Sequence, residues 1–145
     1  MIVVDTTVLV YAVGDEHPLR DPCRAVVSAI DAGELAATTT IEVIQEFCHV
    51  RTRRRSRADA AALARSYADL FTPLLVVDRE DLVEGLDLFD EVDVLGAFDA
   101  VLAATARRRA ADALVSADVA FSTVADLHHL DPASRGFTTA LARLR

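Results

Sequence analysis

Short, almost unbroken apolar runs alternate with helical patterns along the whole of this 145-residue chain. Strands made of such runs are buried on both faces, and a helix between successive strands is typical of a parallel sheet covered on both sides. The sequence therefore predicts an α/β fold with a central parallel sheet, in a single domain spanning residues 1–145. The expected strands lie at Ile2–Asp5, Leu35–Thr38, Leu74–Val77, Ala113–Ser116 and near Leu127–Leu130.

Helices are expected between these strands, where apolar residues recur at helical spacing. Thr39 or Thr40 can cap the helix after the second strand, and Pro73 ends a later one. Residues 8–13 are expected to form a loop that passes into a helical turn. The expected helices cover Pro22–Ala32, Ile41–Arg53, Asp59–Leu70, Glu80–Phe89, Asp99–Ala110 and a short segment near Thr138–Leu144.

The charge balance of the chain is acidic, with 15 basic and 23 acidic residues and a net charge of −8. A protein that simply coats nucleic acid is usually basic, so this balance argues against RNA as a partner. The argument is weak, because arginines gather in one block at residues 51–57 and in another at residues 107–109.

Two further features bear on where the protein works. No apolar run is long enough to span a bilayer, and the N-terminus has no signal-peptide pattern, so we expect a cytoplasmic protein with no membrane partner. Cys23 and Cys48 fit no metal-binding spacing. We expect two buried free thiols, with a disulfide between them as the alternative.

Four acidic residues lie where chemistry is expected in such a fold, because sites form beyond the carboxyl ends of parallel strands. Asp5 and Asp118 follow strand ends, Glu46 lies on a helix, and Asp99 opens another helix. Carboxylates that crowd together repel one another, and carboxylate oxygens are ligands that Mg²⁺ prefers. A convergent set of these acids would therefore imply a divalent cation.

Each of these acids also has a structural interpretation. Asp99 can be a helix N-cap, Asp118 a turn residue, and Glu46 a solvated charge on a helix surface. Asp5 is harder to explain in this way. A carboxylate directly behind three β-branched residues, at the start of a buried core, is costly unless it is paired or bound to a metal.

The chain resembles PIN domains, and among them the VapC-type toxins. The resemblance rests on four segments in order along the chain, VVDTTVL at 3–9, TIEVIQEF at 40–47, FDA at 98–100 and LVSADVAF at 114–121. It implies a three-layer α/β/α sandwich with a central parallel sheet, endoribonuclease activity, homodimerisation and inhibition by a cognate antitoxin. It also implies one or two Mg²⁺ or Mn²⁺ ions, and a metal-activated water that attacks the RNA phosphodiester.

The resemblance also implies roles for individual residues. Thr7 and Ser116 lie where the family often has a hydroxyl near the metal. Glu42 competes with Glu46 as the acid of the helix. Glu46 is preferred because Gln45-Glu46-Phe47 fits the family's helix better, and Glu42 is given a supporting role. The late segment has Ala117 where the family more often has a basic residue. The four family acids fall on Asp5, Glu46, Asp99 and Asp118.

The first arginine block is a candidate contact surface for RNA phosphates or for an acidic stretch of an antitoxin. Its candidate residues are Arg51, Arg53, Arg54 and Arg55. The alternative for both arginine blocks is a solvated helix end, where cations interact favourably with the helix dipole. His128 and His129 receive no catalytic role.

Three hypotheses follow: a metal-dependent ribonuclease toxin, a PIN-fold RNA-processing nuclease without a toxin role, and a non-catalytic interaction module. For a nuclease we expect single-stranded or looped RNA as substrate, because a flexible strand reaches a recessed site more easily than a duplex does.

Overall fold

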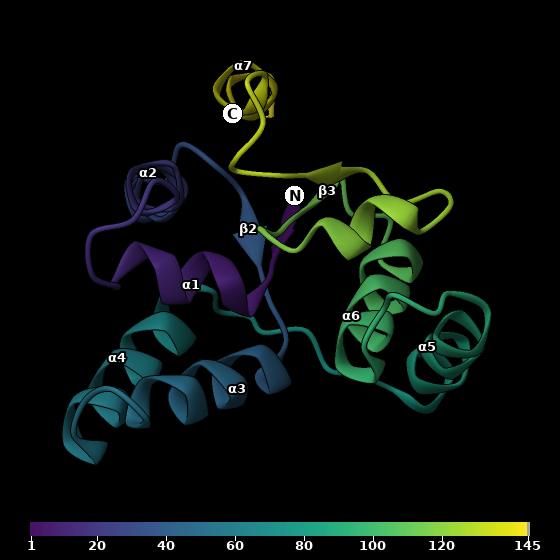
Figure 1. Cartoon of the computed structure of the whole chain (residues 1–145), viewed down its shortest axis with the longest axis horizontal. Helices are drawn as coiled ribbons and strands as arrows, with labels where there is room; N and C mark the ends of the chain where they lie inside the picture. The colour runs from purple at the N-terminus through teal and green to yellow at the C-terminus, as the bar shows by residue number, and fades with distance from the viewer. Residues whose placement is uncertain (145) are drawn as a thin grey trace.

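A sheet of parallel strands forms the centre of the computed structural model, which describes residues 1–144 (Figure 1). Each pair of neighbouring strands is parallel, and the sheet order is β2-β1-β3-β4. In the register, Val3 lies opposite Thr38 on one side and Leu114 on the other. The strands are β1 (Ile2–Val4), β2 (Ala37–Thr38), β3 (Ala113–Val115) and β4 (His129–Leu130). The predicted α/β fold with a central parallel sheet is confirmed.

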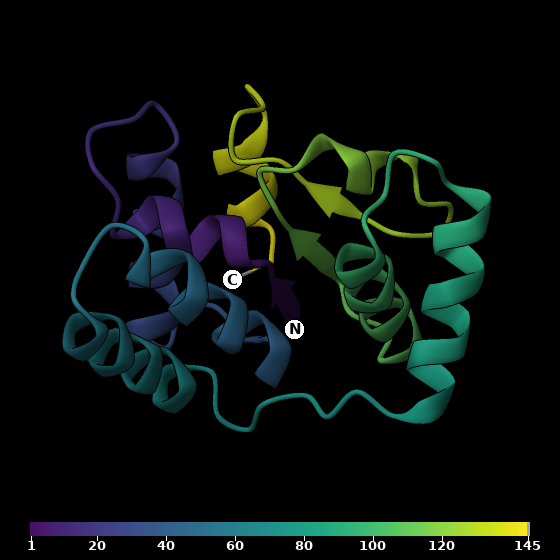
Figure 2. The ribbon, with the colours of Figure 1, turned by 60° about the horizontal axis from the view of Figure 1, so that its bottom comes forward.

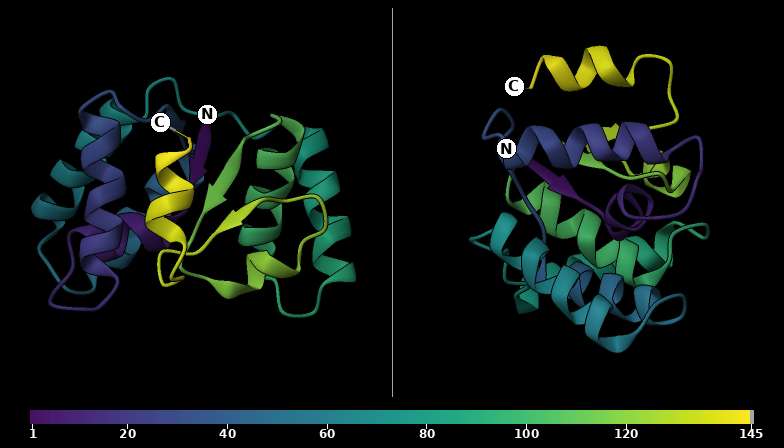
Figure 3. Two further views of the ribbon diagram at one scale, coloured as in Figure 1. Left: turned by 90° about the horizontal axis from the view of Figure 1, so that it is seen from above. Right: turned by 90° about the vertical axis from the view of Figure 1, so that its left-hand side faces the viewer.

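Helices cover both faces of this sheet. They are α1 (Thr6–Ala12), α2 (Arg20–Asp31), α3 (Ile41–Thr52), α4 (Arg57–Leu70), α5 (Arg79–Glu91), α6 (Ala97–Arg108), the 3-10 helix η1 (Val119–Thr123) and α7 (Phe137–Ala142). In the right-hand view of Figure 3, α2 and α7 lie on one side of the strands and α3, α4 and α6 on the other. The molecule is thus a three-layer α/β/α sandwich, and β1 and β3 are buried along their whole length.

Most helix starts follow from polar residues that cap them. The side chains of Thr40 and Ser56 accept hydrogen bonds from backbone N–H groups in the first turns of α3 and α4. Asp78 and Asp81 form a reciprocal capping box at the start of α5. These helices begin within about two residues of the predicted positions, as the usual uncertainty of helix ends allows.

The prediction of a strand at Leu74–Val77 is wrong. This segment forms a single parallel bridge between Leu75 and Thr40, outside the named strands. Side chains bond backbone carbonyls in and beside this segment. Thr38 Oγ1 donates to the carbonyl of Pro73, which precedes it, at 2.9 Å, and Arg109 donates to the Val76 carbonyl at 3.1 Å. The segment therefore runs as an extended connection from α4 to α5, beside the helix pairs α3–α4 and α5–α6 (Figure 2).

The prediction for residues 8–13 also differs from the structure. A regular helix, α1, covers Thr6–Ala12 and starts directly after β1. Its N-cap is Asp5, whose side chain accepts a hydrogen bond from the backbone N–H of Thr7. An acid that was singled out for chemistry is therefore also the residue that starts this helix.

Helices α5 and α6 form a closely packed pair. A Cβ atom on Gly85 would lie 2.6 Å from the Cα of Val101, so the helices approach each other at this point as only glycine allows. The fully buried carboxylate of Asp81 accepts hydrogen bonds from Arg108 at 2.6 Å and from Arg109 at 2.8 Å. The second arginine block thus ties the end of α6 to the start of α5.

The structure also bears on the expectations for membrane-spanning helices and for the two cysteines. No helix within residues 1–144 combines the length and the apolar character that crossing a membrane requires. Cys23 and Cys48 are both free thiols. Cys23 is buried as expected, whereas Cys48 is half-buried on α3. The pKa of the Cys23 thiol is raised to about 12, chiefly by burial and then by the negative charge of Asp131.

Candidate metal-binding active site

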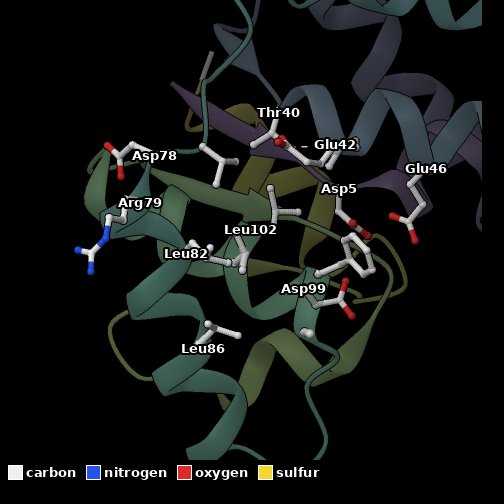
Figure 4. Close-up of a pocket in the computed structure, with 15 residues that line it drawn as sticks. Asp5, Thr40, Glu42, Glu46, Asp78, Arg79, Leu82, Leu86, Asp99 and Leu102 are labelled. Atoms are coloured by element: carbon white, nitrogen blue, oxygen red, sulfur yellow. Dashed lines mark hydrogen bonds between the residues drawn. The ribbon is translucent and has the colours of Figure 1, made fainter.

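A pocket of about 560 Å³ lies between α3 on one side and α5 and α6 on the other, at the carboxyl end of β1. Three of the four predicted acids, Asp5, Glu46 and Asp99, line it, and Glu42 lines it as well. Figure 4 shows the carboxylates of Asp5, Glu46 and Asp99 at the same end of this pocket. The strand order explains why Asp5 and Asp99 lie close together. Asp5 directly follows β1, and Asp99 lies on α6, the helix that precedes the neighbouring strand β3.

Asp5 is the most firmly held of these acids. Its side chain is only 3% exposed. Its Oδ2 atom accepts hydrogen bonds from the Thr7 backbone N–H at 3.1 Å, from Thr7 Oγ1 at 2.6 Å and from Ser116 Oγ at 2.7 Å. Because all three bonds go to Oδ2, the Oδ1 atom is left for a ligand in the pocket. Thr7 and Ser116, which the resemblance singled out, therefore fix the orientation of Asp5.

Glu46 lies in the middle of α3, with its side chain exposed at the pocket. The hydroxyl of Thr6 donates a hydrogen bond of 2.6 Å to Glu46 Oε2. Sequence reasoning missed Thr6, although it is a hydroxyl residue directly after Asp5. Glu42, one turn earlier on α3, is also exposed and also lines the pocket.

Asp99 is the third residue of α6, and the N-cap of that helix is Gly96. The interpretation of Asp99 as the helix cap is therefore wrong. The pKa of Asp99 is raised to about 7, chiefly by burial and then by the negative charges of Asp5, Asp118 and Glu46. The pocket thus concentrates negative charge around a carboxyl group that resists ionisation.

Asp118 stands apart from the other three acids, since it is not among the residues that line the pocket. It is the N-cap of η1, and its Oδ1 accepts a hydrogen bond of 2.8 Å from the Ala120 backbone N–H. Its own backbone N–H donates to Ser116 Oγ at 2.9 Å. The Oδ1 atom of Asp118 thus has the structural role expected of a turn residue. The negative charge of Asp118 still helps to raise the pKa of Asp99.

The donor set of this pocket fits a hard divalent cation. Carboxylate oxygens are the protein ligands that Mg²⁺ and Mn²⁺ prefer, and a cation would offset the repulsion that raises the pKa of Asp99. Within residues 1–144, no three His, Cys, Asp or Glu side chains already stand close enough together to hold a metal ion. Asp5, Glu46 and Asp99 nevertheless line one pocket, and their oxygens are of the type that such an ion takes.

The pocket continues from the acids into an apolar wall that sequence reasoning missed. Leu82 and Leu86, one turn apart on α5, line it together with Phe98, which directly precedes Asp99. Phe98 is 76% exposed, and both leucines are exposed as well. The sequence signal for this wall was the pattern of apolar residues along α5. Leu88 in that pattern is buried in the core, whereas Leu82 and Leu86 are exposed. The acids thus share their pocket with an uncovered apolar surface.

The first arginine block divides into two kinds of residue. Arg51 donates to Asp59 Oδ2 at 2.7 Å and to the Val13 carbonyl at 3.0 Å, and Arg55 pairs with Asp15 at 3.0 Å. These two arginines tie the turn between α3 and α4 to the end of α1.

Arg53 and Arg54, the other two candidate contacts, have no carboxylate partner among the described residues. Arg53 is exposed and lies 3.1 Å from the ring nitrogen of His49, and Arg54 is exposed beside a small cavity. Their guanidinium groups therefore remain available to an anionic partner.

Comparisons with known proteins agree on one family. A family model described as PIN domain matches residues 2–127. Ribonuclease VapC7 of Mycobacterium tuberculosis (strain ATCC 25618 / H37Rv) is 52% identical, over 97% of this chain and 98% of that protein. Ribonuclease VapC23 of Mycobacterium tuberculosis (strain CDC 1551 / Oshkosh) is 33% identical over 75% of this chain and 86% of that protein.

Two solved structures share the fold at low sequence identity. FitAcB from Neisseria gonorrhoeae has a TM-score of 0.70 at 16% identity, covering 91% of this chain and 98% of that one. VapBC2 from Rickettsia felis, bound to a DNA fragment from their promoter, has a TM-score of 0.69 at 14% identity, covering 90% and 98%.

Proposed function

This chain belongs to the PIN-domain family and to its VapC-type ribonucleases, and we propose that its acidic pocket cleaves RNA phosphodiesters with bound Mg²⁺ or Mn²⁺. The observation that carries this proposal is the convergence of Asp5, Glu46 and Asp99 on one pocket. The raised pKa of Asp99, caused first by burial and then by the neighbouring carboxylates, agrees with it. Membership of an enzyme family argues against a purely non-catalytic interaction module.

The residues of the pocket would act by holding the ion and orienting the substrate around it. A bound divalent ion supplies positive charge against the phosphate and lowers the pKa of water at the site. Asp5 offers Oδ1 from a position fixed by Thr7 and Ser116. Glu46 and Asp99 offer oxygens from facing helices, and Asp118 adds negative charge from the end of β3.

Single-stranded RNA is the proposed substrate, because a flexible strand can enter a pocket that lies between helices. Arg53 and Arg54, just past the end of α3, are the proposed phosphate contacts, since Arg51 and Arg55 are held in ion pairs. Such contacts would compensate locally for the net charge of −8. We further propose that the protein acts on RNA in the cytoplasm.

Cleavage mapping of RNA by the purified protein tests this function. With Mg²⁺ or Mn²⁺, wild type should cut at defined single-stranded positions, and EDTA should stop the reaction. Asp5→Asn should abolish cleavage, whereas Asp93→Asn, which removes an exposed acid that does not line the pocket, should cut like wild type. Equal cleavage by Asp5→Asn and wild type, or activity on duplex DNA alone, would contradict the proposal.

An antitoxin is the proposed partner of this pocket. The apolar wall of Leu82, Leu86 and Phe98 beside the acids fits an amphipathic segment with basic residues.

A growth experiment separates a toxin from an RNA-processing enzyme of the same fold. Expression alone should arrest growth, and a small neighbouring open reading frame should rescue it; growth without arrest would favour the processing enzyme.

A homodimer is also proposed, as the family resemblance implies. Exposed apolar side chains on α5, such as Val83 and Phe89, support it because a protein surface rarely leaves such groups uncovered in a cluster. Sedimentation equilibrium of the purified chain should give twice the mass of 15.6 kDa. A monomer at all concentrations would contradict the dimer without affecting the proposed chemistry.

A further inference from the structure

We infer that Thr6 is a positioning residue for metal binding, which holds the carboxylate of Glu46 toward Asp5 and Asp99. This inference rests on the proposed function, because it assumes that Glu46 helps to hold a divalent ion. The hydrogen bond from Thr6 Oγ1 to Glu46 Oε2 joins residues 40 positions apart, on two different helices, at 2.6 Å. It therefore depends on how α1 and α3 pack together.

The position of Thr6 frees its hydroxyl for this role. Thr6 is the first residue of α1, and the N-cap interaction of that helix is made by Asp5 with the backbone N–H of Thr7. At the first helical position there is no preceding turn whose carbonyl the hydroxyl can bond, as threonines within helices often do. The Thr6 side chain is 6% exposed, so its hydroxyl needs a partner inside the protein, and Glu46 supplies it.

Glu46 needs a fixing contact more than Asp5 does. Asp5 is buried and accepts three hydrogen bonds on one oxygen, whereas Glu46 is exposed and has a longer side chain with more rotatable bonds. A long exposed side chain loses conformational entropy when it binds an ion. A buried hydroxyl that already holds Oε2 lowers this cost and leaves Oε1 to face the pocket.

The same contact distinguishes between the two acids of α3. Glu42 and Glu46 lie one turn apart and both line the pocket. The Thr6 hydroxyl bonds Glu46, and Glu42 lies nearer to the start of α3. The geometry therefore assigns the role of helical ligand to Glu46.

The test is a comparison of Mn²⁺ affinities, measured by isothermal titration on the whole purified chain. Thr6→Val replaces the hydroxyl by a methyl group of similar size and should weaken Mn²⁺ binding about 10-fold or more, as is typical when a contact behind a metal ligand is lost. Thr6→Ser keeps the hydroxyl and should bind within about 3-fold of wild type, because the hydrogen bond can still form. Thr52→Val removes a hydroxyl from the end of α3 that bonds the His49 carbonyl, and it should bind like wild type.

A double-mutant cycle separates positioning from a general effect on the fold. In the Glu46→Ala background, adding Thr6→Val should cause no further loss of Mn²⁺ affinity, because the group it positions is gone. A second loss of the same size in that background would overturn the inference. Wild-type affinity in Thr6→Val would also overturn it while leaving the proposed function intact. If wild type itself neither binds Mn²⁺ nor cleaves RNA, the proposed function fails, and this inference fails with it.

Discussion

Asp99→Asn should stabilise the metal-free protein at alkaline pH, although it removes a proposed metal ligand. In the folded state the pKa of Asp99 rises from its ordinary value of 3.8 to about 7, first because of burial and then because of Asp5, Asp118 and Glu46. A carboxyl group with a raised pKa binds its proton more tightly in the folded than in the unfolded chain. Stability is therefore lost as the pH rises from about 4 to about 7, and the full cost remains above pH 7.

The magnitude follows from this pKa. A rise from 3.8 to about 7 corresponds to about 4 kcal/mol for a carboxylate fully shielded from water. Asp99 is only half-buried at the pocket, so solvent and salt reduce this cost, and we expect about 1–2 kcal/mol. The substitution also loses a favourable charge in the first turn of α6, which is worth roughly 0.3 kcal/mol in the opposite direction.

Urea unfolding followed by circular dichroism, in EDTA at pH 4.5 and pH 8, measures this effect. Asp99→Asn should raise the free energy of unfolding by about 1–2 kcal/mol at pH 8 and change it little at pH 4.5. Asp93→Asn, an exposed acid in the loop before α6, should stay within about 0.5 kcal/mol of wild type at both values. If Asp99→Asn is no more stable than wild type at pH 8, the acids do not repel one another as described.

Two further substitutions test the packing and the end of α6, the helix that carries Asp99. Gly85→Ala brings a methyl group to 2.6 Å from the Cα of Val101 and should destabilise the protein by about 1–3 kcal/mol in thermal unfolding; an unchanged melting temperature would contradict the close helix contact. Ala110 follows α6 with a φ of +49°, so Ala110→Gly should raise the unfolding free energy by about 0.5–1 kcal/mol, and a loss of stability would contradict the strained backbone at this position.

The parts of the fold that the sequence predicted well are those in which local pattern and burial agree. The β-branched run of β1 and the apolar run of β3 are buried throughout. Leu74–Val77 has the same local pattern but lacks a neighbour to complete a ladder, because it meets Thr40 at a single bridge. Strand pairing is a property of the whole chain, which a local apolar run does not specify.

The candidate site shows the same division. Asp5 could be singled out because a carboxylate behind an apolar strand is unusual, and its position at the pocket agrees with that reasoning. The bond from Thr6 to Glu46 could not be foreseen, since it depends on the packing of α1 against α3. The roles of Arg51 and Arg55 likewise depend on partners that only the folded chain brings near.

The most direct measurement is a Mn²⁺ titration of wild type and of four variants, each replacing one acid by its amide: Asp5→Asn, Glu46→Gln, Asp99→Asn and Asp118→Asn. Wild type should bind one or two ions, and the replacements of the three acids that line the pocket should each weaken binding about 10-fold or more. Asp118→Asn should weaken it less, because Asp118 acts on Asp99 from outside the lining of the pocket. Mn²⁺ binding that none of the four substitutions changes, or no binding to wild type, would contradict a metal site built from these acids.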